Sequence, residues 1–151
     1  MLRLVVAPAL RGAGLKGSGT RYRLDGETTW ARIGFRSSQY NHADLVEFTV
    51  NLCVVGRLAW ESARRERPHL PKEPSPNTFY GPLVWNHRIG RLMPSGRDEW
   101  WRLDRHSDPD AVGKSVVAAL LDHGLPAMRR ELARPAPAAR AKPAGSSTQA
   151  A

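Results

Sequence analysis

A pair of alternating segments around an Asp-Gly turn constrains the fold of this chain most. Residues 20–24 and 27–35 alternate polar and apolar side chains. Asp25-Gly26 between them is a preferred two-residue hairpin turn, because both central positions need positive φ. In that register Leu24 lies opposite Glu27, and the two faces carry the following sets. One face carries Tyr22, Leu24, Ile33 and Phe35, and the other carries Arg21, Arg23, Trp30 and Arg32. The agreement between the two strands predicts a hairpin with one apolar and one basic face.

A third strand is predicted over Leu45–Val54, where the same alternation continues. Its even-numbered residues from Val46 onward are apolar, and its odd-numbered residues are mostly polar. Antiparallel pairing with the second strand would place Glu47 opposite Arg36 and Asn51 opposite Arg32, and opposite charges facing each other across strands are favourable. The result is a sheet with one aliphatic face and one polar face that bears arginines.

Beyond the third strand the alternation is weaker. Four prolines between positions 68 and 76 forbid a helix or a central strand, so residues 67–76 are predicted to form a loop within the domain. A fourth strand is predicted near residues 83–92. Residues 97–103 are predicted to form a short strand or a turn that carries two indoles.

Helices are expected at both ends of the chain. The N-terminal segment is typical of an amphipathic helix that stops at Gly12 and Gly14. Asp108-Pro109 opens a second helix, because Asp caps free N–H groups and Pro suits the first turn. Gly124 is expected to end that helix, and a short closing helix follows over residues 125–132. We therefore predict an α+β domain, in which N- and C-terminal helices pack on the apolar face of an antiparallel sheet of about four strands.

Composition places the chain among small basic domains. A single α+β domain is expected over residues 1–133, followed by a disordered Ala/Pro/Arg tail over residues 134–151. The formal charge is +9, but 19 of the 23 basic residues are Arg. A GC-rich coding sequence produces that bias in any protein, and we favour this explanation over a nucleic-acid surface. No apolar run is long enough for a membrane span, and none has the form of a signal peptide, so we expect a cytoplasmic protein.

Three motifs that resemble chemical sites have simpler structural explanations. Residues 12–17 match G-x-G-x-x-G, but a helix leads in and a strand leads out, which is the reverse of a dinucleotide site. The single cysteine, Cys53, excludes an internal disulfide and is expected to be a buried, inert thiol. His106-Ser107-Asp108-Pro109-Asp110 is favoured as a helix N-cap over a metal site. We expect no cofactor, no metal and no catalytic residue.

Arginines and indoles supply the candidate binding residues. Indoles beside arginines form stacking or cation–π sites, and such a groove suits a planar or anionic ligand. Ordinary packing of each ring is the favoured alternative. His87, in the predicted fourth strand, is the best candidate for a functional imidazole, although a structural role is more common. The candidate binding residues are Trp30, Arg32, Arg36, Asn51, Trp85, His87, Arg88, Arg91 and Trp101.

The order of several short motifs resembles a known family. A helix ends in a Leu-Gly segment at residues 10–15, and further motifs follow it along the chain. They are Gly19-Thr20-Arg21-Tyr22-Arg23, Phe35-Arg36-Ser37-Ser38-Gln39, Phe48-Thr49-Val50-Asn51-Leu52, Arg88-Ile89-Gly90-Arg91-Leu92 and Trp100-Trp101 before a C-terminal helix. Over roughly Leu2 to Leu132 the chain resembles the bacterial domain-of-unknown-function family numbered 4304. The family usually has Gln-Lys-Ser-like residues after the second strand, where this chain departs from it. The resemblance implies an α+β fold and no established activity, so it transfers no catalytic residue.

Three functions are compatible with these features. The leading hypothesis is a non-enzymatic binding or interaction module, whose Arg/Trp-rich sheet face meets a protein partner or an anionic ligand. Direct nucleic-acid binding is the alternative, motivated by the basic charge. An unrecognised enzyme is the third hypothesis, with Asn51, Asn86, His87 and Arg88 as its polar cluster.

Overall fold

The structure is a computed structural model that describes residues 1–24 and 26–135. It confirms the α+β fold, but the antiparallel sheet has six strands in the described residues, where about four were predicted. The strands are β1 (Lys16–Ser18), β2 (Arg21–Leu24), β3 (Thr29–Ser37), β4 (Leu45–Gly56), β5 (Trp85–Arg88) and β6 (Trp101–Asp104). The helical segments are η1 (Leu2–Val6), α1 (Ala7–Gly12), α2 (Arg57–Glu66), η2 (Gly81–Leu83), α3 (Ile89–Leu92), α4 (Pro109–Ala119), η3 (Leu120–Gly124) and α5 (Leu125–Leu132). The predicted tail falls almost entirely on residues 136–151, which lie outside the described residues.

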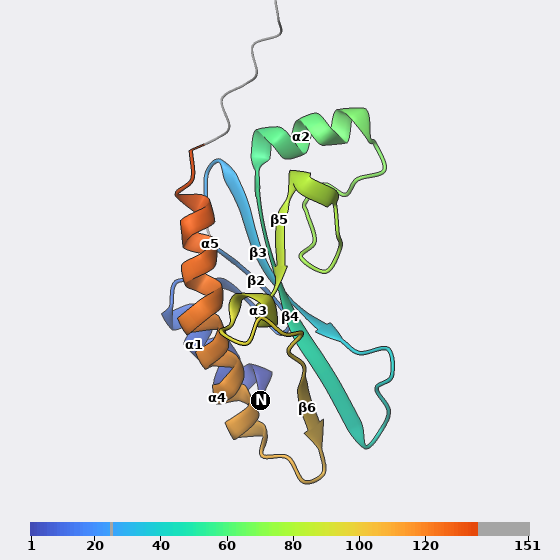
Figure 1. Ribbon diagram of the computed structural model, residues 1–151, viewed down its shortest axis with the longest axis vertical. Coiled ribbons are helices and arrows are strands. Elements are labelled where there is room, and N and C mark those ends of the chain that lie inside the picture. The colour runs from blue at the N-terminus through green and yellow to red at the C-terminus, as the bar shows by residue number, and fades with distance from the viewer. Residues whose placement is uncertain (25, 136–151) are drawn as a thin grey trace, which may run out of the picture.

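The long strand β4 is the centre of the sheet (Figure 1). One of its edges pairs with β3 from Phe48 to Gly56. Its other edge pairs with β6 at residues 45–48 and with β5 at residues 51–54. β2 and then β1 extend the sheet beyond β3. Because β5 and β6 share one edge of β4, that strand sets the positions of both.

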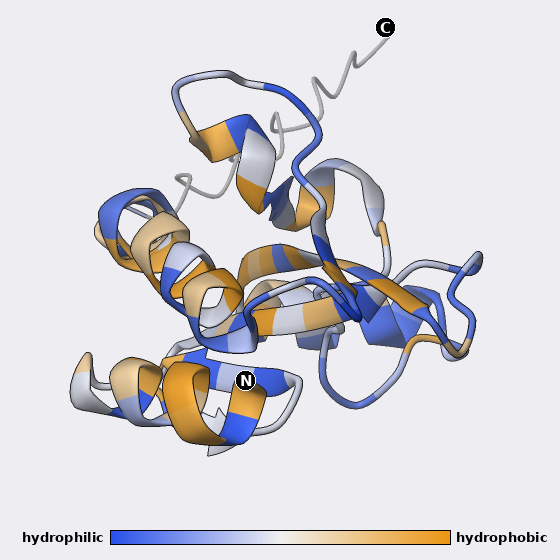
Figure 2. Cartoon of the chain, turned by 90° about the horizontal axis from the view of Figure 1, so that it is seen from below, coloured by the Kyte–Doolittle hydropathy of each residue, from blue (hydrophilic) through white to orange (hydrophobic). Residues whose placement is uncertain are grey.

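The two faces of the sheet differ as the alternation predicted. Ile33, Phe48 and Leu52 lie on the apolar face and are almost completely buried. Helices from both ends of the chain cover this face, and α2 lies on the opposite side (Figure 1 and Figure 2). Arg32 and Arg36 lie on that opposite face, which we call the polar face. The predicted arrangement of an aliphatic face under the terminal helices is therefore confirmed.

Both predicted strand registers are wrong, each by an even number of residues. Leu24 pairs with Ala31, four residues beyond its predicted partner, so the hairpin connection is longer than two residues. Between β3 and β4 the partners lie two residues beyond the predicted ones. Arg36 faces Thr49 instead of Glu47, and Arg32 faces Cys53 instead of Asn51. Side chains alternate with period two, so these even shifts leave each one on its predicted face.

The predicted end of the C-terminal helix at Gly124 is also wrong. The helix continues from α4 through the π-helical turn η3 into α5, and the three form one column in Figure 1. The Leu125 N–H donates to the Leu120 carbonyl, five residues back. A Cβ at Gly124 would lie 3.0 Å from the Ile89 Cδ1 and 3.2 Å from the Leu52 Cδ2. Glycine therefore allows the helix to approach the sheet closely at this point.

The fourth strand is shorter than predicted. β5 covers only Trp85–Arg88, and the chain then turns into α3. At Gly90 the backbone of Arg97 and Glu99 lies so close that no Cβ would fit. Residues 97–103 were predicted to form a short strand or a turn. Because the 97–99 segment packs against Gly90, the strand in this region, β6, begins only at Trp101.

The polar face carries a second, smaller core, which the sequence analysis did not predict. Helix α2 covers one end of this face, and its Trp60 is fully buried beside Cys53 and Val55. The Trp60 indole N–H donates to the carbonyls of Pro71 and Lys72, both at 3.2 Å. These contacts tie the proline-rich loop to the helix. Residues 67–76 contain no helix or strand, as predicted.

Residues 73–77, here called the strap, cross the polar face over Gly34. The Asn77 side-chain amide donates to the Phe35 carbonyl at 3.2 Å. The Asn77 Oδ1 in turn accepts from the Asn51 Nδ2 at 2.9 Å. The Pro76 carbonyl accepts from the Asn86 Nδ2 at 3.0 Å. Three hydrogen bonds therefore join the strap to three different strands of the sheet.

We predict that Gly34→Ala destabilises the protein by displacing the strap. A Cβ at Gly34 would lie 2.6 Å from the Pro76 Cγ and 3.2 Å from the Asn77 amide atoms. Crowding of this kind costs about 1–3 kcal/mol, which urea unfolding would detect. Gly12→Ala is the control, because a Cβ there meets nothing within 4 Å. Equal free energies of unfolding for the two variants would contradict a seated strap.

We predict that Cys53 resists thiol reagents in the folded protein. Burial raises the pKa of the Cys53 thiol to about 12, and the nearby positive charge of Arg32 only partly offsets this effect. The side chain is 0% exposed. At about pH 8 the native protein should therefore react far more slowly than the unfolded chain, whose free thiol is partly ionised. Labelling of the native protein at the unfolded rate would show that the second core is open.

Candidate functional site

The polar face carries a pair of hollows that have no lining residue in common within the described part of the chain. The first, the basic groove, has a volume of about 390 Å³ and lies between β1–β3 and the strap. Its lining is Lys16, Gly17, Arg21, Tyr22, Arg23, Arg32, Ile33, Gly34 and Glu73–Asn77. The second, the Trp100 hollow, has a volume of about 560 Å³. Its lining is Arg36, Ser37, Ser38, Gln39, Tyr40, Glu47, Arg88 and Trp100.

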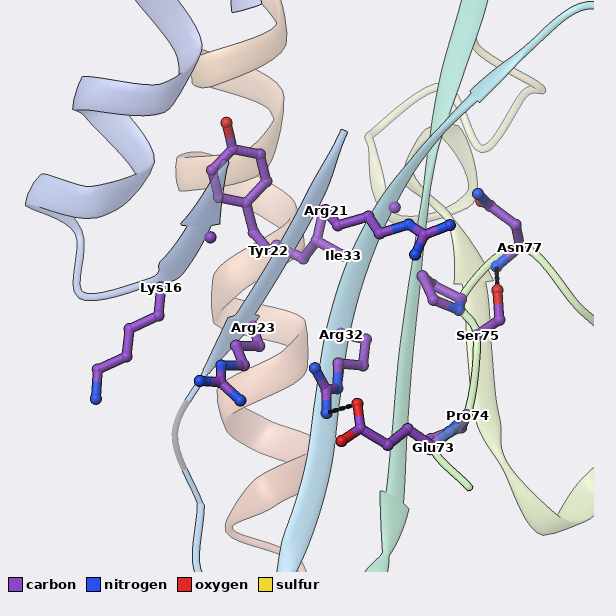
Figure 3. A pocket seen from close by; sticks show the side chains of 13 residues that line it. Lys16, Arg21, Tyr22, Arg23, Arg32, Ile33, Glu73, Pro74, Ser75 and Asn77 are labelled. Carbon is purple, nitrogen blue, oxygen red and sulfur yellow. Dashed lines mark hydrogen bonds and ion pairs between the residues drawn. The ribbon is translucent and has the colours of Figure 1, made fainter. Parts of the chain in front are cut away.

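The positive charges of the basic groove come from side chains that alternate onto the polar face along the strands. Arg21 and Arg23 are separated by two positions on β2, so both side chains lie on the polar face. Figure 3 shows Arg21 extending toward the strap, whereas the Tyr22 ring lies on the other side of the sheet. Lys16 joins from β1, whose register places it opposite Arg23. Three neighbouring strands thus contribute cations to the lining of one groove.

Arg32 is held in the groove by an ion pair and by an aromatic ring. Its Nη2 donates to the Glu73 Oε2 at 2.7 Å, a contact drawn in Figure 3. Its guanidinium also lies 4.7 Å from the centre of the Trp30 ring. Arg57 lies at 3.9 Å from the same ring, so Trp30 contacts two guanidinium groups. The Arg32 side chain is only 16% exposed, and these contacts fix its orientation toward the groove.

The charge of the groove is unbalanced. Among the described residues of the lining, Glu73 supplies the one carboxylate, and it is paired with Arg32. Among residues 1–24 and 26–135, Arg21 and Arg23 make no side-chain hydrogen bond or ion pair. Like charges gathered in a concave surface raise the local concentration of counter-ions. The geometry therefore favours an anion between β2 and the strap.

Next to the Trp100 hollow, the Asp98 carboxylate binds the side chains of two lining residues, Arg88 and Trp100. The Asp98 Oδ2 accepts from the Arg88 Nη1 at 2.6 Å and from the Trp100 Nε1 at 3.0 Å. The Arg88 guanidinium lies 5.2 Å from the centre of the Trp100 ring. The hydrogen bond from Arg88, above all, lowers the pKa of the Asp98 carboxyl, and the bond from Trp100 acts in the same direction. Asp98 is therefore ionised at neutral pH and orients both side chains.

Buried contacts place this group on the polar face. The Thr49 Oγ1, which is 0% exposed, donates to the Glu99 carbonyl at 2.7 Å. The backbone of the same segment also lies close to Gly90. On the opposite wall, Asn41 fixes the loop after β3 by two hydrogen bonds with the Glu47 backbone, at 2.7 and 3.0 Å. Both walls of the hollow are thus held by the fold.

The structure divides the nine predicted binding residues among several places. Arg32 lines the basic groove, and Arg36 and Arg88 line the Trp100 hollow. The remaining two on the polar face, Trp30 and Asn51, support Arg32 and the strap. These five are the residues that the polar face brings together.

The other four predicted binding residues lie elsewhere. Trp85 and His87 are in register with Val54 and Leu52, which places them on the apolar face. Trp101 is buried against Phe48, with ring centres 5.9 Å apart, and its Nε1 donates to the Ser115 hydroxyl. Arg91 lies in α3, where its Nη1 donates to the Gly96 carbonyl. The polar cluster considered for an enzyme is also divided, because His87 lies across the sheet from Asn51, Asn86 and Arg88.

Sequence reasoning missed several lining residues as candidates. For Arg21 and Arg23 the signal was present, because both alternate onto the predicted basic face of the hairpin. For Glu73 no local signal exists, since its pairing with Arg32 depends on the path of the strap. The choice between Trp100 and Trp101 depends on the β4–β6 register, which places Trp101 opposite the buried Phe48.

Other motifs have structural roles. The Asp108 Oδ1 accepts from the Asp110 N–H at 2.9 Å, which confirms the predicted helix cap. Within the described ranges, no group of three or more His, Cys, Asp or Glu side chains is placed to hold a metal ion. No helix in those ranges is long and apolar enough to cross a membrane.

Comparison with known proteins identifies the family. Residues 6–130 match the family described as Domain of unknown function (DUF4304). No curated protein and no solved structure matches the chain. The matched range covers most of the sequence and agrees with the resemblance that the order of its motifs indicated. The chain therefore belongs to the DUF4304 family.

Proposed function

We propose that the chain is a non-enzymatic binding module whose basic groove holds a small anion with several negative charges. The observation that carries this proposal is the convergence of Arg21, Arg23 and Arg32 on one groove, where the one carboxylate among the described lining residues is already paired. The volume of about 390 Å³ lies within the range of small-ligand pockets. A small anion therefore suits the groove better than an extended protein surface does.

The donor groups suit phosphate or carboxylate oxygens. A guanidinium presents its N–H groups in a plane and forms paired hydrogen bonds with such anions. The Glu73 carboxylate already gives Arg32 one anionic oxygen partner, and Arg21 and Arg23 face the same volume. A ligand with two or more anionic groups could form hydrogen bonds with the arginines of β2 and of β3 at the same time.

The lining supports binding more than catalysis. Its described residues include no histidine or cysteine, and the one carboxylate among them is held in an ion pair. A general acid–base mechanism needs a side chain that exchanges a proton near neutral pH. Arginine does not do so, because its pKa lies far above that range.

We predict that Arg21→Gln/Arg23→Gln weakens binding of inorganic tripolyphosphate at least tenfold, measured by isothermal titration calorimetry. Each guanidinium contact to an anion contributes about 1.5–3 kcal/mol, so losing two has a large effect. Arg3→Gln/Arg130→Gln is the matched control, because it removes the same charge from exposed helical positions away from the groove. The control should bind within about twofold of the wild type.

Two outcomes would overturn this proposal. One is equal weakening in both double variants, which would indicate a general effect of net charge. The other is binding of a single-stranded oligonucleotide by a wild-type protein that does not bind tripolyphosphate. In that case nucleic-acid binding would replace the small-anion function.

A further inference from the structure

We infer that the Trp100 hollow is a second binding site, for a ligand that joins an aromatic ring bearing N–H donors to an anionic group, as a mononucleotide does. This inference goes beyond the proposed function, because the described lining residues of the hollow are all different from those of the basic groove. The volume of about 560 Å³ is within the range for ligands of this size.

The hollow offers aromatic surfaces to a planar ring. The Trp100 indole is only partly buried, and its N–H is already bonded to Asp98, which fixes the ring plane. Tyr40 lines the same hollow from the loop after β3 and is 76% exposed. Exposed aromatic rings beside an arginine are the side chains on which bases stack. A base placed here would cover apolar surface that is now in contact with water.

Arg36 is the side chain best placed to take the anionic group. Arg88 is already paired with Asp98, whereas Arg36 makes no hydrogen bond or ion pair with any residue in the described ranges. Two serine hydroxyls line the wall beside it. The Ser38 Oγ accepts from the Tyr40 N–H at 3.2 Å, so its own proton remains available for donation. Hydroxyls next to a guanidinium are suitable donors to a phosphate.

Glu47 distinguishes this site from a general anion site. Its carboxylate lines the hollow, and within the described residues it has no side-chain hydrogen bond or ion pair. A lone carboxylate repels a simple polyanion but accepts hydrogen bonds from ring and amino N–H groups. Its presence together with Arg36 therefore favours a ligand with both donors and negative charge. A nucleotide has both features, whereas inorganic phosphate has no ring N–H.

The test is calorimetric titration of the full chain with AMP, GMP, CMP, UMP and inorganic phosphate. The wild type should bind at least one nucleotide more tightly than it binds phosphate. Arg36→Gln should weaken the binding of that nucleotide about tenfold, because one charged contact is lost. Trp100→Leu should also weaken nucleotide binding. The Arg21→Gln/Arg23→Gln variant should bind the nucleotide with a dissociation constant within about twofold of the wild-type value.

The exposed position of Arg36 keeps the test clear of folding defects, and urea unfolding of each variant verifies this. The inference is overturned if no nucleotide binds in the millimolar range, or if Arg36→Gln binds it as tightly as the wild type does. It is also overturned if the groove variant loses the nucleotide to the same extent, because both effects would then arise in the basic groove. If the Arg21→Gln/Arg23→Gln variant loses tripolyphosphate binding but keeps nucleotide binding, the two sites are independent. This result distinguishes the two proposals.

Discussion

The hydrogen bonds that seat the strap on the sheet determine the arrangement of the polar face. Asn77 bonds to Asn51 on β4 and to the Phe35 carbonyl on β3, directly over Gly34. Because no side chain stands at Gly34, the strap lies in contact with the strands. It supplies one wall of the basic groove and brings Glu73 to Arg32. The Trp100 hollow, whose lining includes no strap residue, remains as a separate site on the same face.

The two faces of the sheet have different roles, because apolar and polar side chains alternate along the strands. The apolar face is covered by helices from both chain ends, so its side chains serve stability. The polar face is covered by α2 and the strap only in part, which leaves arginines from β2 and β3 facing open volumes. Charged side chains cost little where water still reaches them, and there they remain available to ligands. The proposed binding functions both depend on this incomplete cover.

Much of the fold follows from local sequence, whereas the site depends on long-range placement. In the first three predicted strands, alternation predicted the face of each residue correctly, and the register errors of two and four residues did not change those faces because both shifts are even. It did not do so for Trp85 and His87 in the fourth strand, which lie on the apolar face. The role of Gly124 was not predictable, since it depends on Ile89 and Leu52, which are remote in sequence. Likewise, no local pattern places Glu73 on Arg32 or the Asn77 amide on Asn51. The arginines could be foreseen on one face, but the hollows that they line could not.

A double-mutant cycle on Asn51 and Asn77 tests the seating of the strap most directly. Free energies of unfolding would be measured for Asn51→Ala, Asn77→Ala and the double variant. The 2.9 Å hydrogen bond between the two amides predicts that their effects are coupled by about 0.5–1.5 kcal/mol. Effects that add within about 0.3 kcal/mol would contradict this account, because the two amides would then not interact across the polar face.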